Sequence, residues 1–320
     1  MQIVYLSNRP TVLAGTLQAV ARCQTWVDHA VVCAPGHQHD EMRSLTVDVW
    51  PHQLTLIDEN DLTGLDTNGI SALGHVERNV TLRRAMVDSG HTASTFMLSD
   101  DDYRPLTSIP LTDYVGEDGR HHGYWFYELM QWPGDQTSYD HAQIRTLGVL
   151  QLLGMPTLAY GSHMPQIMTV DGWKRAFELS DRVGGGALVD EWSLYFNINT
   201  AERPDRFGEP LPFRTLAWPQ WPHQWPFFVR PDPIRFENHH PEHEAEGGLF
   251  AGLDPVGSDA DALERIVAWR SAEVSIGELR FDPDWLDPWT RGQQHRRGAA
   301  AAIRAAARVR KYTNFSDPDR

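Results

Sequence analysis

The stretch Ser94-Thr95-Phe96-Met97-Leu98-Ser99-Asp100-Asp101-Asp102-Tyr103-Arg104-Pro105 decides the organisation of the chain. A short apolar run ends in three consecutive aspartates and then in a turn residue. Its length and its boundaries are typical of a buried strand rather than of a helix. Three adjacent carboxylates repel one another and raise one another's pKa unless a cation lies between them, and magnesium and manganese prefer such oxygen ligands. In open α/β sheets, ligands bind beyond the carboxyl ends of the strands, so we expect a metal-diphosphate site here. The alternative is a solvated acidic turn or a helix N-cap.

Length and composition limit the class of protein. The chain has 320 residues, of which 41% are hydrophobic, so one large α/β domain or two small ones can form. It contains no run of about 18 apolar residues, and we expect no membrane span. The start, MQIVYLSNRP, has no basic region before an apolar segment, so we expect no secretory signal. Cys23 and Cys33 are the only cysteines, which argues against a disulfide scaffold and favours a cytoplasmic location.

The charge is unevenly distributed. A net charge of −15 argues against a nucleic-acid-binding protein. Residues 291–320, however, hold eight Lys or Arg and two Asp, a net +6, which leaves −21 for residues 1–290. A basic helix and tail on an acidic body is suited to contact with a membrane face, a polymer or DNA, and the alternative is a solvated face or an oligomer contact.

The order of expected elements favours a parallel sheet. The chain opens with a strand at Gln2–Ser7, a helix from Pro10 to about Arg22 and a strand at Ala30–Ala34, which together form a βαβ unit. Neither a G-x-G-x-x-G nor a Walker motif is present, which argues against dinucleotide and P-loop sites. Residues 211–233 form a loop rich in Trp and Pro, suited either to stacking on sugars or to packing over the sheet. Further strands are expected near residues 54–57, 94–100, 124–129, 157–161 and 236–240, and further helices near 70–89, 138–153, 169–181, 187–197, 260–273 and 298–311.

Three segments in this order resemble the GT-A glycosyltransferases, which use nucleotide-sugar donors. They are VYLSNRPTVLAGTLQAV at 4–20, HVERNVTLRRAMVDSG at 75–90 and FMLSDDDYRPL at 96–106. The resemblance covers about residues 1–110 well and the remainder loosely. It implies a GT-A-like, Rossmann-like fold with a mixed, mainly parallel sheet flanked by helices. It also implies a nucleotide-sugar-binding half at 1–110, a more irregular acceptor and catalytic half at 111–290, and a basic C-terminal segment at 291–320.

The resemblance assigns the acid triplet to the family's DXD motif. Asp102 is then expected to bind Mn²⁺ or Mg²⁺, which neutralises the departing β-phosphate. Asp100 is expected to contact the metal or the ribose. Asp101 is expected either in the nucleotide site or directed into the scaffold. Many members place a later histidine on the metal, which is His239 or His240 here, with His240 favoured.

Other residues are candidates for binding and catalysis. An acceptor hydroxyl needs a carboxylate to accept its proton. The resemblance implies that an acidic pair near the start of a helix in the second half supplies it, and Asp190 or Glu191 fits that pattern by order and type. The sequence does not distinguish the two, and such a pair also complements a helix dipole. The nucleotide-pocket candidates are Arg9, Asp58, Arg78 and Asn79, with surface ion pairs as the alternative. Arg83 and Arg84 are expected to be solvated helix charges, and His163 to be a ligand, a catalytic group or simply a hydrogen-bonded side chain.

These observations lead to one main hypothesis and three competing ones. The expected reaction is metal-dependent transfer of a sugar from a nucleotide-diphosphate sugar, a UDP-sugar first of all, with inversion, to an unknown acceptor. That acceptor is a glycan, a polymer, a small molecule or modified DNA. The turn His163-Met164-Pro165 is similar to one in Stealth-type sugar-phosphate transferases, which pair an acidic strand end with a later His-x-Pro. A phage-type DNA-base glycosyltransferase and a non-enzymatic carbohydrate-binding module are the remaining two hypotheses.

Overall fold

The computed structural model of the chain describes residues 1–132, 137–216, 235–246 and 251–252. The helices expected near 260–273 and 298–311, the basic segment 291–320 and Trp218, Trp221 and Trp225 lie outside these residues. None of the helices within the described ranges combines the length and the apolar character that a membrane crossing requires.

A five-stranded sheet with the order β3-β2-β1-β4-β9 forms the centre of the molecule. Its strands are β1 (Gln2–Leu6), β2 (His29–Ala34), β3 (Gln53–Asp58), β4 (Thr95–Asp100) and β9 (Gln166–Thr169). The first four are parallel, whereas β9 runs antiparallel to β4. The expected mixed, mainly parallel α/β fold is therefore confirmed. The strand β9 was not predicted, because four residues are too few to show a period and its partner is distant in sequence.

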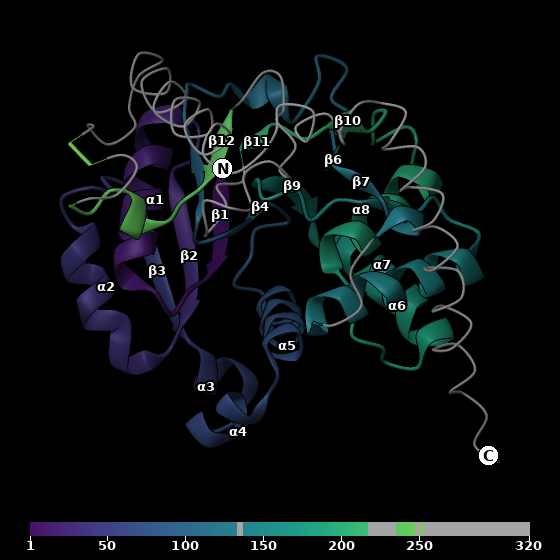
Figure 1. Cartoon of the computed structure of the whole chain (residues 1–320), viewed down its shortest axis with the longest axis horizontal. Coiled ribbons are helices and arrows are strands. Elements are labelled where there is room, and N and C mark those ends of the chain that lie inside the picture. Colours follow the sequence, from purple (N-terminus) through teal and green to yellow (C-terminus); the bar gives the residue numbers. More distant parts are fainter. Residues whose placement is uncertain (133–136, 217–234, 247–250, 253–320) are drawn as a thin grey trace, which may run out of the picture.

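Helices cover both faces of this sheet (Figure 1). Pro10 occupies the first turn of α1, where its missing N–H costs nothing. Thr137 and Asp140 form a capping box at the start of α6, and Gly154, with φ +67°, ends it. The helices are α1 (Pro10–Cys23), α2 (His39–Thr46), α3 (Glu59–Thr63), α4 (Thr67–Ala72), α5 (His75–Asp88), α6 (Ser138–Leu153), α7 (Val170–Gly184) and α8 (Glu191–Glu202).

Several predicted elements differ from the structure, among them the strand expected at 157–161, of which only β8 (Leu158–Ala159) forms. The helix expected at 70–89 is divided into α4 and α5, because Leu73 is extended and Gly74 is the N-cap of α5. The helix expected from residue 187 begins only at Glu191, where Asp190 is the N-cap. The aromatic strand expected at 124–129 is two short strands, β6 (Tyr124–Trp125) and β7 (Tyr127–Glu128), which belong to different sheets.

Small sheets and 3₁₀ turns complete the described fold. A three-stranded sheet with the order β11-β12-β5 begins directly after the acid triplet. Its strands are β5 (Tyr103–Pro105), β11 (Thr215–Leu216) and β12 (Phe236–Asn238), while β6 pairs with β10 (Leu211–Pro212) and β7 pairs with β8 (Leu158–Ala159). The 3₁₀ turns are η1 (Gly36–Gln38), η2 (Leu111–Asp113), η3 (Leu129–Gln131) and η5 (Pro241–His243).

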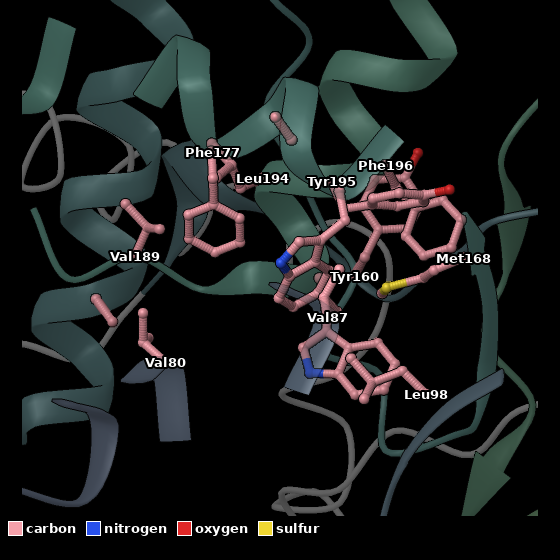
Figure 2. Close-up of a cluster of buried hydrophobic side chains, with 14 of the residues drawn as sticks. Val80, Val87, Leu98, Tyr160, Met168, Phe177, Val189, Leu194, Tyr195 and Phe196 are labelled. Carbon is pink, nitrogen blue, oxygen red and sulfur yellow. The ribbon is translucent and has the colours of Figure 1, made fainter. Parts of the chain in front are cut away.

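Alternating side chains of the strands fill two apolar layers. On one face, β1 and β2 pack against α1 through residues such as Ile3, Tyr5 and Leu17. On the other face, Leu98 of β4 and Met168 of β9 meet side chains from helices α5, α7 and α8 (Figure 2). Those labelled in Figure 2 from these helices are Val80, Val87, Phe177, Leu194, Tyr195 and Phe196. Because both faces of β1, β2 and β4 are covered, these strands contain nearly continuous apolar runs, whereas the edge strand β3 is largely half-exposed.

The register of the central strands places two polar segments side by side. Leu6 of β1 is paired with Asp100 of β4, so Ser7–Arg9 and Asp100–Asp102 leave the sheet at the same edge. The strand order also changes direction here, because β2 lies on one side of β1 and β4 on the other. Such a switch point is where open α/β sheets bind ligands.

Candidate active site

The carboxylate of Asp101 is held by the protein. It is only 4% exposed and accepts hydrogen bonds from Ser7 Oγ at 2.6 Å and from Arg9 Nε at 3.2 Å. Arg9 Nη2 donates to the other carboxylate oxygen, and the backbone carbonyl of Asp101 accepts a further hydrogen bond from Thr16 Oγ1 at 2.6 Å. Burial raises the pKa of Asp101, against the lowering effect of Arg9. These contacts tie Asp101 to Ser7 and α1, and the residue also contributes to the wall of the cavity described next, so both alternatives given for Asp101 stay open.

Asp100 and Asp102 present their carboxylates to a cavity of about 390 Å³. The side chain of Asp100 is 31% exposed and pairs with Arg83, while that of Asp102 is 17% exposed and lies 3.1 Å from Arg9 Nη2. The backbone carbonyl of Asp102 also accepts a hydrogen bond from the N–H of His239 at 2.7 Å. Both carboxylates are thus fixed in position while one side of each remains open to the cavity.

Arginine side chains from the start of α1 and from α5 line the same cavity. Arg9, Arg78 and Arg83 all contribute to its wall, as does Asn79. Arg78 is paired with Glu59, which is buried behind it. A guanidinium held by a carboxylate on one edge keeps its other N–H groups for an incoming anion, and this geometry suits phosphate oxygens.

The prediction that Arg83 is a solvated charge is wrong. Arg83 is 5% exposed and its Nη1 donates to Glu191 Oε1 at 3.0 Å, while its Nη2 pairs with Asp100. The guanidinium also lies 5.8 Å from the ring centre of Trp192. The spacing contains a signal that was missed, because positions 79 and 83 are one turn apart and share a helix face. Arg84, by contrast, lies at the surface and pairs with Asp181.

A second cavity of about 240 Å³ adjoins the first. The two share four residues in their walls, namely His75, Asn79, Arg83 and Asp100. The second cavity is also lined by both candidate bases and by residues that sequence reasoning did not select, among them Tyr103, Tyr139, Gly161 and Trp192. The structure therefore brings Asp190 and Glu191 next to the acid triplet, although about ninety residues separate them in the sequence.

The two candidate bases have different surroundings. Asp190 is the N-cap of α8, and its Oδ2 accepts a hydrogen bond from Ser193 N at 2.8 Å. Glu191 is the partner of Arg83. Burial raises the pKa of Asp190, although the hydrogen bonds from Ser193 act in the opposite direction. Burial also raises the pKa of Glu191, against the lowering effect of Arg83.

His163 lines the second cavity in an unusual backbone conformation. Its φ is +53°, and it is the one non-glycine residue with positive φ in the described part of the chain. Its ring meets that of Tyr103 edge to face at 5.4 Å, and its buried Nδ1 has no hydrogen-bond partner among the described residues. Strained backbone of this kind is concentrated at functional sites.

Two predicted site residues lie outside both cavity walls. Asp58 is the N-cap of α3, where its Oδ1 accepts from Asn60 N at 2.9 Å. His240 lies at the start of η5, 3.6 Å from Glu242 Oε1. The ring of His239 lies against Gly15 of α1, where a Cβ on that glycine would lie 3.1 Å from its Nε2.

Asp100 and Asp102 offer carboxylate oxygens of the kind that a divalent cation takes as ligands. Magnesium is commonly held by one or two carboxylates together with substrate phosphates and waters. His240 does not gather with these two aspartates in the described residues. A separate group of three residues in the described part of the chain brings possible metal-ligand atoms within 4.8 Å of one another. These residues are Glu237, His239 and Glu244. Arg104 pairs with both of those glutamates, just as Arg83 pairs with Asp100 and Arg9 with Asp102.

The chain was compared with known proteins. No protein-family model matches it, and neither does any curated protein. Among solved structures it is similar to the galactosyltransferase LgtC in complex with donor and acceptor sugar analogues (12% identity, 92% of this chain and 100% of that chain, TM-score 0.44). It is also similar to mouse xyloside xylosyltransferase 1 (8% identity, 75% of this chain and 98% of that chain, TM-score 0.40). A further similar structure is the bifunctional glycosyltransferase WbbM (10% identity, 87% of this chain and 51% of that chain, TM-score 0.46). At these identities and TM-scores the likeness carries no argument about the activity, which has to be argued from the two cavities.

Proposed function

We propose that this protein transfers a sugar from a nucleotide-diphosphate sugar, first of all a UDP-sugar, to a hydroxyl group of an acceptor. The observation that carries the proposal is the pair of adjoining cavities with Asp100 and Arg83 in both walls. One offers arginines and the acid triplet, which suit a diphosphate. The other offers two buried carboxylates, which suit a sugar and the hydroxyl group that attacks it.

The larger cavity would hold the nucleoside diphosphate. Arg9 and Arg78 donate to phosphate oxygens there, and Asn79 offers an amide to the ribose or to the phosphates. Asp100 and Asp102 are the residues that would hold Mn²⁺ or Mg²⁺. A bound cation of this kind neutralises the negative charge that develops on the departing phosphate.

The smaller cavity would hold the sugar and the attacking hydroxyl. In the proposed inverting reaction, the acceptor oxygen forms a bond to the anomeric carbon while the bond from that carbon to the phosphate oxygen breaks. The electron pair leaves with the nucleoside diphosphate, and the hydroxyl proton passes to a carboxylate of the Asp190–Glu191 pair. Arg83, between Glu191 and Asp100, sets the spacing between the two halves of the site.

Product analysis on a panel of nucleotide sugars tests this proposal. The wild-type protein, incubated with Mn²⁺ and UDP-glucose, UDP-galactose, UDP-N-acetylglucosamine or GDP-mannose, is expected to release a nucleoside diphosphate from at least one of them. The Asp102→Asn variant should release at least about 100-fold less, which is the scale for loss of one transition-state charge contact. Binding of a nucleotide sugar without any turnover, in the presence of diverse sugar acceptors, would instead support a carbohydrate-binding module.

One observation favours a second candidate, transfer of a sugar phosphate. His163 lies in the smaller cavity with strained backbone, and its Met164-Pro165 neighbours complete the turn noted in the sequence. In that reaction the acceptor oxygen would bond to the β-phosphorus, and the bond from the β-phosphorus to the bridging oxygen would break. A nucleoside monophosphate would then be released instead of a diphosphate. Chromatography of the released nucleotide separates the two reactions.

A further inference from the structure

A row of polar residues on α6 faces the start of α8. Tyr139, Gln143 and Thr146 are spaced by four and three residues, so they share one face of the helix. Tyr139 is partly buried and Gln143 and Thr146 are buried, while the other buried positions of α6 are apolar or glycine, as in Ile144 and Leu147. Polar side chains in such a buried face need partners. The group that they surround is Asp190.

Asp190 is fixed by neutral hydrogen-bond donors and acceptors. Its N–H donates to Thr146 Oγ1 at 2.7 Å, and that hydroxyl donates to the carbonyl of Ala142, also at 2.7 Å. Its Oδ2 accepts from Ser193 N at 2.8 Å. The amide of Gln143 is buried on the same face, and neither its Nε2 nor its Oε1 has a hydrogen-bond partner among the described residues. One carboxylate oxygen is therefore anchored, and the direction of the other is fixed.

The second oxygen of Asp190 and the hydroxyl of Tyr139 meet at Gly161. A Cβ placed on Gly161 would lie 3.1 Å from Tyr139 Oη and 3.4 Å from Asp190 Oδ1. All three residues line the smaller cavity. The missing side chain at position 161 thus leaves both oxygens facing the same space. A tyrosine hydroxyl keeps its proton at neutral pH and can donate it in a hydrogen bond. Burial, and next the nearby Asp190 carboxylate, raise the pKa of Tyr139 further above its ordinary value.

Glu191 differs from Asp190 in its partner. Its Oε1 accepts from Arg83, whose other nitrogen pairs with Asp100. A carboxylate that is paired with a fixed guanidinium is stabilised in its charged form and is a weaker base than one held by neutral groups. The role of Glu191 is therefore to hold Arg83 in position.

We propose that Tyr139 and Asp190 together receive the attacking hydroxyl group, and that Glu191 serves as the counter-ion of Arg83. This inference rests on the proposed function and assigns the roles within it. Tyr139 donates a hydrogen bond to one lone pair of the acceptor oxygen and orients it. Asp190 Oδ1 accepts the proton as that oxygen bonds to the anomeric carbon and the nucleoside diphosphate departs.

Hydrolysis of the donor tests this assignment without knowledge of the acceptor, because water then takes the place of the hydroxyl group. The probe is the nucleotide sugar of the panel above that raises the melting temperature of the wild-type protein most in the presence of Mn²⁺. Asp190→Asn should lower kcat for nucleotide release at least about 100-fold, and Tyr139→Phe about 10-fold, with the donor KM within about twofold of wild type. Glu191→Gln should lower kcat less than Asp190→Asn does. The matched control is Tyr127→Phe, since Tyr127 lines neither cavity.

Gly161→Ala provides a second, independent variant. Its methyl group would occupy the space between the two oxygens, and because position 161 is not among the glycines with positive φ, alanine fits the backbone. We expect a loss of kcat with an unchanged donor-induced rise in melting temperature. In the wild-type protein, kcat should fall at acidic pH because the base becomes protonated. The residual kcat of Asp190→Asn should not show this fall, and a purely structural role of Asp190 would not remove it.

The outcomes separate this inference from the proposed function. Donor binding that is intact in every variant, with hydrolysis unchanged in Tyr139→Phe and Gly161→Ala, would overturn the inference and leave the transferase standing. A larger loss in Glu191→Gln than in Asp190→Asn would overturn it as well. If the wild-type protein binds and hydrolyses no nucleotide sugar, the proposed function fails and this inference fails with it.

Discussion

Replacing Arg83 by methionine tests whether the link between the two cavities is a buried ion pair. The guanidinium is 5% exposed and Glu191, its partner at 3.0 Å, is 4% exposed. Methionine retains most of the packing volume beside Trp192 but provides no hydrogen-bond donor. The variant therefore leaves the Glu191 carboxylate buried without its cation. Asp100 loses a partner too, but it is partly open to water.

The expected loss of unfolding free energy in Arg83→Met is large because a buried charge is left without its partner. Removal of one partner from a buried pair costs about 3–5 kcal/mol, whereas replacement of both by neutral groups is often close to neutral. We expect about 4 kcal/mol for Arg83→Met at neutral to slightly basic pH. The double variant Arg83→Met/Glu191→Gln should recover about half of this or more, because the carboxylate charge is then absent.

The cost should also depend on pH. Burial already raises the pKa of Glu191 in the wild-type protein, and loss of Arg83 removes the group that opposes this shift. A carboxyl group whose folded pKa lies above its unfolded value destabilises the fold at high pH, and the penalty disappears as pH falls toward the unfolded pKa. The cost of Arg83→Met should therefore be smaller at about pH 5 than at about pH 7.5. The double variant should show little of this change.

Urea unfolding followed by circular dichroism measures these differences. The wild-type protein, both single variants and the double variant are compared at about pH 7.5 and about pH 5, and the double-mutant cycle gives the coupling between residues 83 and 191. A cost below about 1 kcal/mol at the higher pH would show that Arg83 is the solvated surface charge that the sequence predicted. Additive effects of the two single variants would refute the ion pair equally well.

Two further predictions concern the scaffold. Gly36→Ala would place a Cβ 1.9 Å from Asp58 Oδ2, so Asp58 must move and its cap on α3 is weakened. We expect the free energy of unfolding in urea to fall by about 1–3 kcal/mol. An unchanged unfolding midpoint would contradict this contact. For Asp171, burial opposes the shift, but hydrogen bonds from Thr169 and Arg203 outweigh it and lower the pKa to about 2. Its contribution to stability is present above the unfolded pKa of about 3.9 and is lost as pH falls toward about 2. Because this side chain is 55% exposed, Asp171→Asn should lower the free energy of unfolding by only about 1 kcal/mol at neutral pH. The difference in unfolding free energy between the variant and the wild-type protein should narrow by about pH 3. A difference that stays constant over this pH range would argue against the lowered pKa of Asp171.

Local patterns in the sequence were sufficient for the elements that position the triplet. The apolar run before Asp100 is a central strand, and the helix expected at 138–153 has these bounds in the structure, because Thr137 and Gly154 are strong helix boundaries. The four-residue β9 was missed, since its place beside β4 comes from a long-range pairing that no local period reveals. The break before α5 was missed because a single glycine within a helical pattern is often tolerated.

The candidate site was only partly predictable for a similar reason. Residue type and order indicated Arg9, Asp190 and Glu191, and the structure places all three in a cavity wall. The burial of Arg83 depends on Glu191, 108 residues away, and no local pattern reveals that contact. Asp58 has the right chemistry and the right strand end, yet its carboxylate is used to cap α3.

Calorimetric titration of UDP into the protein, with MnCl₂ and then with EDTA, tests the central claim that the acid triplet and its arginines hold a donor diphosphate through a cation. We predict that the wild-type protein binds UDP at least about 10-fold more tightly with Mn²⁺, and that Asp102→Asn loses this dependence, since one carboxylate ligand of the cation is removed. The matched control is Asp118→Asn, which removes an exposed carboxylate that lines neither cavity and should behave as wild type. Equal UDP affinity with and without Mn²⁺ in the wild-type protein, or an unchanged Mn²⁺ dependence in Asp102→Asn, would contradict the account.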